Sequence, residues 1–164
     1  MSLENSVRRN IVVSIILLAT VCLIVANLLG KSQDKTFSQN ASTYNEMVSA
    51  LQENHFEITI EKSRLLEDSQ KNTEMYHYVM GLATVSVGEY KKSMQHFQKV
   101  LEINPHNVED SIFMLQYAEI LIHADMKKEA QIVLEKCTEL AAPESFPEYQ
   151  ERIAELQEQL AEQL

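Results

Sequence analysis

The side chains that could carry chemistry are scattered along this sequence without the spacing that a reaction centre needs. The five histidines follow no metal-ligand pattern, and the chain contains no H-E-x-x-H, C-x-x-C or glycine-rich phosphate loop. Only Glu119 and His123, four residues apart, are expected to meet on one helix face, and a third metal ligand is lacking. Cys137 is expected to be a buried apolar side chain rather than a reactive thiol. We therefore predict no catalytic residue, no metal and no cofactor.

An apolar segment without charged residues occupies the N-terminal part of the chain. Residues 11–29 (IVVSIILLATVCLIVANLL) contain only three polar side chains, Ser14, Thr20 and Asn27. As a helix the segment would measure about 28 Å, close to the hydrocarbon thickness of a bilayer. It is longer than the apolar region of a secretory signal and lacks a small-x-small cleavage site at its end. We predict a retained membrane anchor over residues 11–29, preceded by a short head, residues 1–10.

Basic residues flank the anchor on both sides, and their balance decides the predicted orientation. Arg8, Arg9 and the free amine precede it with Glu4 opposing them, whereas Lys31 and Lys35 follow it with Asp34 between them. By the positive-inside rule, this pattern favours an N-terminus in the cytoplasm and a soluble part across the membrane. A more distant alternative keeps the soluble part in the cytoplasm, as an organelle-import receptor.

Acidic residues outnumber basic ones. The chain has 14 Lys and Arg against 24 Asp and Glu, a formal net charge of −10. The only charged side chains before the anchor are those of Glu4, Arg8 and Arg9. The acidic excess therefore lies in the soluble part. Nucleic acids bind to basic surfaces that neutralise phosphate, so we exclude nucleic acid as a partner.

The rest of the chain shows an internal repetition. Residues 30–41 (GKSQDKTFSQNA) are polar and lack regular apolar spacing, which predicts a linker to a domain of residues 42–145. Within that domain, Phe56 and Tyr90 occupy equivalent places in two similar segments 34 positions apart. A repeat of this length predicts a stacked array of helical hairpins.

The central repeat, residues 74–107, resembles the tetratricopeptide repeat family. In that family's pattern, small residues stand where two helices cross, a large apolar side chain fills the space behind them, and a proline closes the second helix. The matching residues of this sequence are Gly81, Tyr90 in the turn, Ser93, Phe97 and Pro105. His77 and Thr84 depart from the pattern, at positions where the family favours tryptophan and tyrosine.

Two further repeats fit the pattern less closely. In the first, Met47 replaces the packing glycine and the closing proline is missing, whereas in the third Ala118 and Ala130 take the packing and crossing positions. Three extra residues, around Val108–Asp110, lengthen the turn before the third repeat. The last segment, residues 146–164, has apolar residues on one helix face and glutamates on the other, which predicts a capping helix.

We therefore predict an all-α protein, in which a single N-terminal transmembrane helix precedes a TPR-like helical-hairpin solenoid of about three repeats with a C-terminal capping helix. The resemblance implies that the first helices of the hairpins line a groove for a peptide. The implied groove residues are Tyr44, Val48 and Leu51 in the first repeat, Tyr78, Leu82 and Val85 in the second, and Leu115, Glu119 and Ile122 in the third.

Two functions from different classes fit these features. The favoured one is a non-enzymatic, chaperone-like adaptor that binds a partner protein or peptide segment beside the membrane. Its layout resembles bacterial inner-membrane tetratricopeptide proteins of envelope assembly or translocation, which implies a location in the bacterial cytoplasmic membrane. The alternative is a constitutive structural subunit or homo-oligomeric scaffold of a membrane complex. In that alternative, neighbours cover the groove and the apolar stripe from Tyr149 to Leu160.

Overall fold

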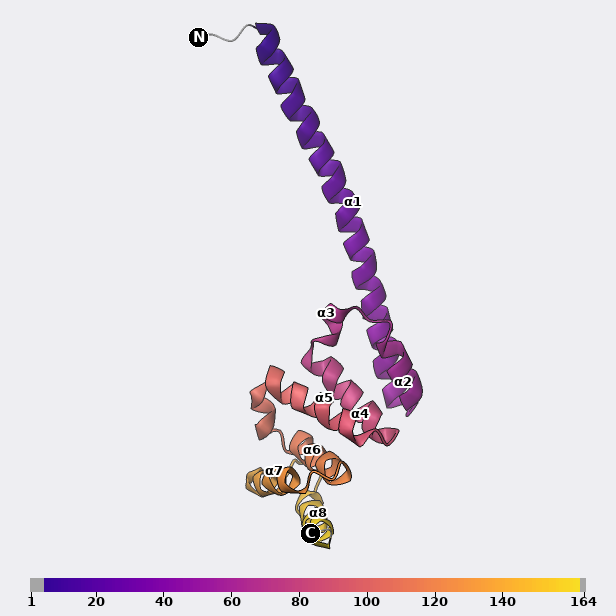
Figure 1. Ribbon diagram of the computed structural model, residues 1–164, viewed down its shortest axis with the longest axis vertical. Helices are drawn as coiled ribbons and strands as arrows, with labels where there is room; N and C mark the ends of the chain where they lie inside the picture. The colour runs from indigo at the N-terminus through magenta and orange to yellow at the C-terminus, as the bar shows by residue number, and fades with distance from the viewer. Residues whose placement is uncertain (1–4, 163–164) are drawn as a thin grey trace. The chain divides into compact units, whose positions relative to one another are not determined.

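The computed structural model describes residues 5–162, except for the side chains of residues 5–13, 15–17 and 32. Within the described range all regular structure is helical. The helices are α1 (Asn5–Gln52), α2 (Phe56–Ser63), α3 (Asp68–Lys71), α4 (Glu74–Ser86), α5 (Tyr90–Ile103), the 3₁₀ helix η1 (Pro105–Glu109), α6 (Ser111–His123), α7 (Lys127–Glu139) and α8 (Tyr149–Glu162) (Figure 1). The chain forms two compact units, residues 1–42 and 43–164, which we call the N-terminal unit and the repeat unit.

The predicted linker, residues 30–41, is helical. α1 continues through it, so its polar composition does not produce the irregular tether that we expected. After Gly30 the segment contains neither glycine nor proline, and its lysines, glutamines and alanine are good helix formers. Extending an existing helix through such residues requires no new nucleation.

The predicted head and anchor fall partly outside the described residues. Side chains are described for Ser14 and from Leu18 onward, so much of residues 1–10 and 11–29 is not covered. No helix among the described residues combines the length and the apolar character that crossing a bilayer requires. The anchor therefore stays a prediction from the sequence.

The repeat unit is a row of packed helix pairs. α4 packs against α5 and α6 against α7, and the pairs are joined by contacts of α2 with α4 and of α5 with α6. α8 follows and packs on α7 and α6 (Figure 1). Buried apolar side chains form one large cluster between Phe97 and Leu160 and a smaller one that includes Met47 and Met80.

The crossing points of the first two repeats share one arrangement. The Ser93 hydroxyl donates to the carbonyl oxygen of Gly81 at 2.7 Å, across the α4–α5 crossing. Thirty-four residues earlier, the Thr59 hydroxyl donates to the carbonyl oxygen of Met47 at 3.4 Å. In both repeats a fully buried side-chain hydroxyl donates to the backbone carbonyl of the residue twelve positions earlier in the sequence. This recurrence confirms the predicted register, including the replacement of the packing glycine by Met47.

The turn inside each hairpin repeats as well. Asn54, Gly88 and Asp125 precede the second helices of the three hairpins, and each has a positive φ, of 60°, 78° and 63°. Glycine adopts this left-handed conformation without steric cost, and asparagine and aspartate tolerate it better than other residues. The same backbone reversal therefore joins the two helices of each repeat.

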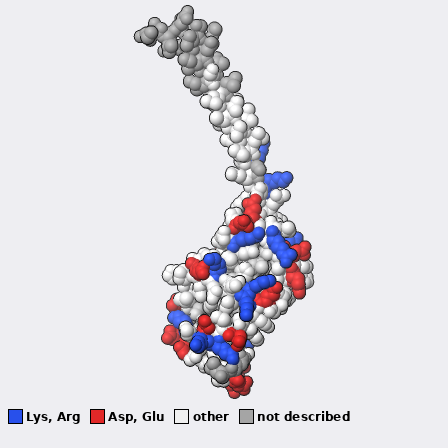
Figure 2. Space-filling view, in the orientation of Figure 1, with Lys and Arg blue, Asp and Glu red and all other residues white. Residues whose placement is uncertain are grey.

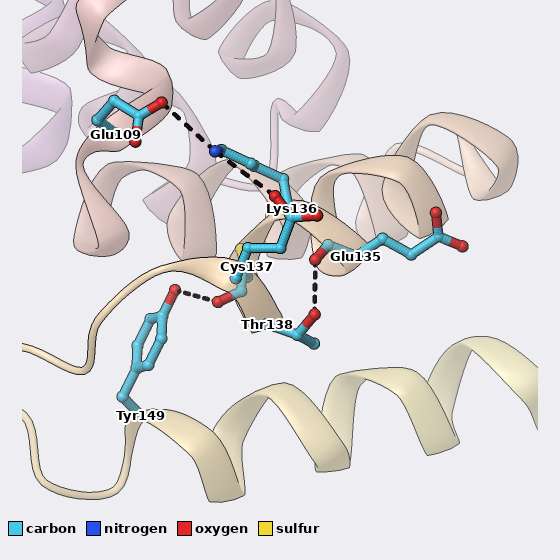
Figure 3. A network of polar contacts seen from close by, with 7 residues as sticks. Glu109, Glu135, Lys136, Cys137, Thr138 and Tyr149 are labelled. Atoms are coloured by element: carbon cyan, nitrogen blue, oxygen red, sulfur yellow. Dashed lines mark hydrogen bonds and ion pairs between the residues drawn. The ribbon is translucent and has the colours of Figure 1, made fainter.

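The third repeat follows the register after the predicted insertion. Ala118 and Ala130 are fully buried at the packing and crossing positions. The extra residues lie at the end of η1 and include Asp110, whose carboxylate accepts a bond from the Phe113 backbone N–H at 2.9 Å and caps α6. Lys136 of α7 approaches Glu109 of η1 at 3.4 Å (Figure 3). The insertion is thus an ordered turn.

The predicted capping helix is α8, and its apolar face is buried within the chain. Tyr149, at its start, donates its hydroxyl to the carbonyl oxygen of Cys137 in the last turn of α7, at 3.1 Å (Figure 3). Burial raises the pKa of the Cys137 thiol, which has no accessible surface, as expected of an apolar role. The buried stripe comprises Tyr149, Ile153, Leu156 and Leu160. No neighbouring molecule is needed to cover this stripe, contrary to the scaffold alternative.

Candidate peptide-binding groove

The predicted groove residues of the first repeat are partly buried. Tyr44, Val48 and Leu51 are partly buried against the smaller apolar cluster. Among the described residues, the buried Tyr44 hydroxyl has no hydrogen-bond partner, and desolvation raises its pKa. These three side chains therefore pack against the core in part and keep some accessible surface.

The groove residues of the second repeat remain partly open. Tyr78, Leu82 and Val85 lie on one face of α4 and pack only partly against the large cluster. The Tyr78 hydroxyl donates to the side-chain oxygen of Gln116 on α6 at 3.0 Å, and its ring lies 5.8 Å from that of Phe97. Burial raises the pKa of the Tyr78 hydroxyl, so it remains a donor at neutral pH. Tyr78 therefore has a fixed orientation between two repeats.

The predicted groove residues of the third repeat are not available to bind a peptide. Leu115 is 5% exposed and Ile122 is 3% exposed, so the expectation that they line an open groove is wrong. Glu119 is engaged by Arg152 of α8, whose guanidinium Nε lies 2.7 Å from the carboxylate. α8 occupies the place that a fourth repeat would take, and it covers this face of α6.

A cleft of about 350 Å³ opens beside Tyr78, where the insertion before the third repeat meets α4. The buried side chains of Val100 and Phe113 lie at its base, whereas Met75, 57% exposed, stands at its mouth. The full lining is Glu74, Met75, Tyr78, Val100, Asn107, Asp110, Ile112 and Phe113. Apart from Tyr78, the groove prediction missed these residues. The sequence signal that could have found them is the three-residue insertion, which provides Asp110 and displaces α6.

Two carboxylates stand at this apolar cleft. The amide of Asn107 donates to Glu74 Oε1 at 2.7 Å, and Asp110 Oδ1 accepts the capping bond from the Phe113 N–H. Within residues 14–162, no basic side chain forms an ion pair with either carboxylate. Both acids are thus held in place by hydrogen bonds, and no cation among the described residues pairs with them.

Residues 76–107 match the tetratricopeptide repeat family model. The match begins in α4 and ends in η1, so it covers the second hairpin and supports the predicted central repeat. No curated protein matches the chain. A tetratricopeptide repeat indicates a module for protein–protein interaction, and such modules are typically non-enzymatic.

The tetratricopeptide hairpin also brings two histidines together, which the sequence reasoning did not predict. His77 of α4 and His96 of α5 lie with their Nδ1 atoms 2.9 Å apart, beside the ring of Tyr76. In contrast, Glu119 and His123 do not pair, because His123 stacks on Tyr90 with ring centroids 4.8 Å apart. No cluster of three or more metal-ligating side chains occurs in the described part of the chain.

We expect the histidine pair to make the repeat unit less stable in weak acid. Burial, and then the neighbouring His77, lower the pKa of His96 from 6.5 to about 4. Below pH 6.5 the unfolded chain binds a proton at this position that the folded chain excludes, so the free energy of unfolding decreases as the pH falls toward 4. Denaturant unfolding at a series of pH values measures this slope.

The matched control for this pH dependence is His96→Gln, which removes the titrating ring. His77 also has a lowered pKa, through burial and the nearby Lys99, with Glu102 opposing, so part of the slope remains in the variant. Identical pH profiles for the wild type and His96→Gln between pH 6.5 and 4 would contradict the prediction.

Proposed function

We propose that the protein is a non-enzymatic adaptor whose repeat unit binds a polypeptide segment of a partner protein. One observation carries the proposal: apolar side chains of α4, namely Met75, Tyr78, Leu82 and Val85, retain accessible surface after all helices of the repeat unit have packed. Apolar surface that remains open beside a cleft commonly marks an interaction site. Tyr78 also has the rigid, amphipathic character of residues that dominate binding energy.

A membrane anchor over residues 11–29 is part of this proposal. Large apolar side chains of the N-terminal unit are exposed, including Leu18 and Leu23, the latter at 71%. This part of α1 carries no charge, which Figure 2 shows as a white surface. Such apolar surface is unfavourable in water and favourable in lipid. We propose an N-terminus in the cytoplasm and a repeat unit outside it, in a bacterial cytoplasmic membrane, on the balance of flanking charges.

The adaptor is favoured over a constitutive scaffold because of α8. The scaffold alternative needs neighbours to cover the stripe from Tyr149 to Leu160, and that stripe is already buried against the chain's own helices. Among the apolar side chains that keep accessible surface, those of α4 form a strip beside a cleft, which suits the binding of a peptide segment.

Site-specific photo-crosslinking in cells tests the adaptor. A photoreactive residue in place of Leu82 is expected to capture polypeptides, and Tyr78→Ala should reduce the captured amount about tenfold. The same photoreactive residue at the exposed position Gln131 on α7 is the control for random encounters. Because Tyr78 also supports the core, Met75→Glu is the second variant, since its exposed side chain can be changed without disturbing the fold. Capture that is equal at both positions and insensitive to both variants would exclude the adaptor.

Membrane fractionation tests the anchor separately. The full chain is expected to stay with membranes washed at alkaline pH, and a variant that lacks residues 11–29 should appear in the supernatant. Recovery of the full chain from the supernatant would remove the anchor from the proposal without affecting the groove.

A further inference from the structure

We propose that the cleft at η1 binds an apolar side chain of the partner segment together with an adjacent lysine or arginine, whose cation is held by Glu74 and Asp110. This inference rests on the proposed function and specifies the chemistry of the bound polypeptide. We refer to the cleft and its two carboxylates as the acidic cleft.

The dimensions of the acidic cleft suit side chains rather than a whole helix. Its volume of about 350 Å³ lies near the lower end of the roughly 300–1,000 Å³ that small-molecule pockets have. The aromatic ring of Tyr78 and the buried side chains of Val100 and Phe113 give it an apolar base. One large aliphatic or aromatic side chain would displace water from that base, which is favourable.

Each of the two carboxylates at the cleft is held through one of its oxygens. Glu74 is fixed through Oε1 by the Asn107 amide, and Asp110 through Oδ1 by the α6 backbone, so Oε2 and Oδ2 take no part in these two bonds. Burial raises the pKa of Tyr78 at the apolar base, the hydrogen bond to Gln116 opposes the shift, and the Asp110 charge adds to it. Hydrogen bonds between a guanidinium or ammonium group and such carboxylates are stronger than neutral ones.

Charge complementarity selects one occupant. An acidic segment or a terminal carboxylate would approach two like charges in a protein of net charge −10, which is unfavourable. A purely apolar segment would dehydrate the two carboxylates without pairing them, which also costs free energy. Only a segment with a large apolar residue next to a basic one both fills the apolar base of the acidic cleft and pairs its two carboxylates with a cation.

Selection from a displayed library of random 12-residue peptides tests the proposal. The target is the full chain in lipid nanodiscs, with empty nanodiscs used to remove background binders. Enriched peptides are expected to carry lysine or arginine within two residues of a large apolar side chain. The double substitution Glu74→Gln with Asp110→Asn should weaken their binding about tenfold. Glutamine keeps an acceptor for Asn107, and asparagine is a good helix cap, so the fold is preserved.

The control substitution is Glu158→Gln on the exposed face of α8, which removes one charge far along the chain from the cleft and should leave peptide affinity unchanged. Enriched peptides that depend on Tyr78 but lack a basic preference, or that ignore the Glu74 and Asp110 changes, would overturn this inference and leave the adaptor standing. Failure to enrich any Tyr78-dependent peptide would overturn both. A dimer in light scattering that the double substitution dissociates would identify a second copy of the chain as the occupant, and would overturn the assignment to a partner.

Discussion

Replacing Gly81 with leucine is expected to lower the free energy of unfolding by about 3 kcal/mol. A Cβ atom at position 81 would lie 2.6 Å from both Cδ2 and Cε2 of Phe97. The Phe97 ring has no accessible surface and is stacked against Phe113 and Tyr117, with ring centroids 4.9 and 5.9 Å apart, so it has no room to move away. Overpacking of a close-packed core costs about 1–3 kcal/mol, and leucine adds three atoms beyond Cβ.

Thermal unfolding of the full chain measures this loss, which should appear as a fall in the melting temperature of roughly 10 °C. Gly30→Ala is the matched control, because a Cβ there meets no atom within 4 Å and alanine favours the helix. A double variant that also carries Phe97→Leu should lose less stability than the sum of the two single variants, since the smaller side chain relieves the clash. An unchanged midpoint for Gly81→Leu would mean that the hairpin is not packed as described.

The parts of the fold that the sequence predicted correctly are those fixed by local size and backbone conformation. Gly81 and Ser93 are small because two helices cross there, and Gly88 adopts a positive φ because the hairpin reverses at that point. These requirements act within about thirty residues, so they leave a readable pattern. The same reasoning placed three extra residues around Val108–Asp110, at the end of η1, since an insertion in a regular array must be absorbed by a turn.

The candidate site was less predictable because it depends on how the repeats are stacked and capped. Leu115 and Ile122 occupy groove positions in the family pattern, but both are buried on the α6 helix whose Glu119 pairs with Arg152 of α8, and nothing in their own repeat shows this. The acidic cleft likewise arises where α4 of one repeat meets η1 and α6 of the next, so Glu74 and Asp110 are brought together only by tertiary packing. The repeat pattern predicts what the repeats share, so it does not predict a cleft that forms only where an insertion interrupts them.

Replacing Tyr149 with alanine is expected to have the second large effect, a loss of about 3–5 kcal/mol of stability. Tyr149 is the largest of the side chains without accessible surface, and it attaches the start of α8 to the end of α7. Removing it leaves a cavity between the two helices and an unpaired hydrogen-bond acceptor at Cys137. Because α8 covers the inner face of α6, its detachment should also expose Leu115 and Ile122, and faster hydrogen exchange in α6 and α8 would report this opening.

Tyr149→Phe separates the contributions of the ring and the hydroxyl. It keeps the apolar volume and removes only the bond to the Cys137 carbonyl, so we expect a loss of about 1–2 kcal/mol, well below that of the alanine variant. Gln150→Ala, at the neighbouring exposed position, should leave denaturant unfolding unchanged. If the phenylalanine and alanine variants lost equal stability, the hydroxyl bond would be what attaches α8. If neither variant lost stability, α8 would not be part of the folded repeat unit. Leu115 and Ile122 would then be accessible, and they would form a third groove segment beside the acidic cleft.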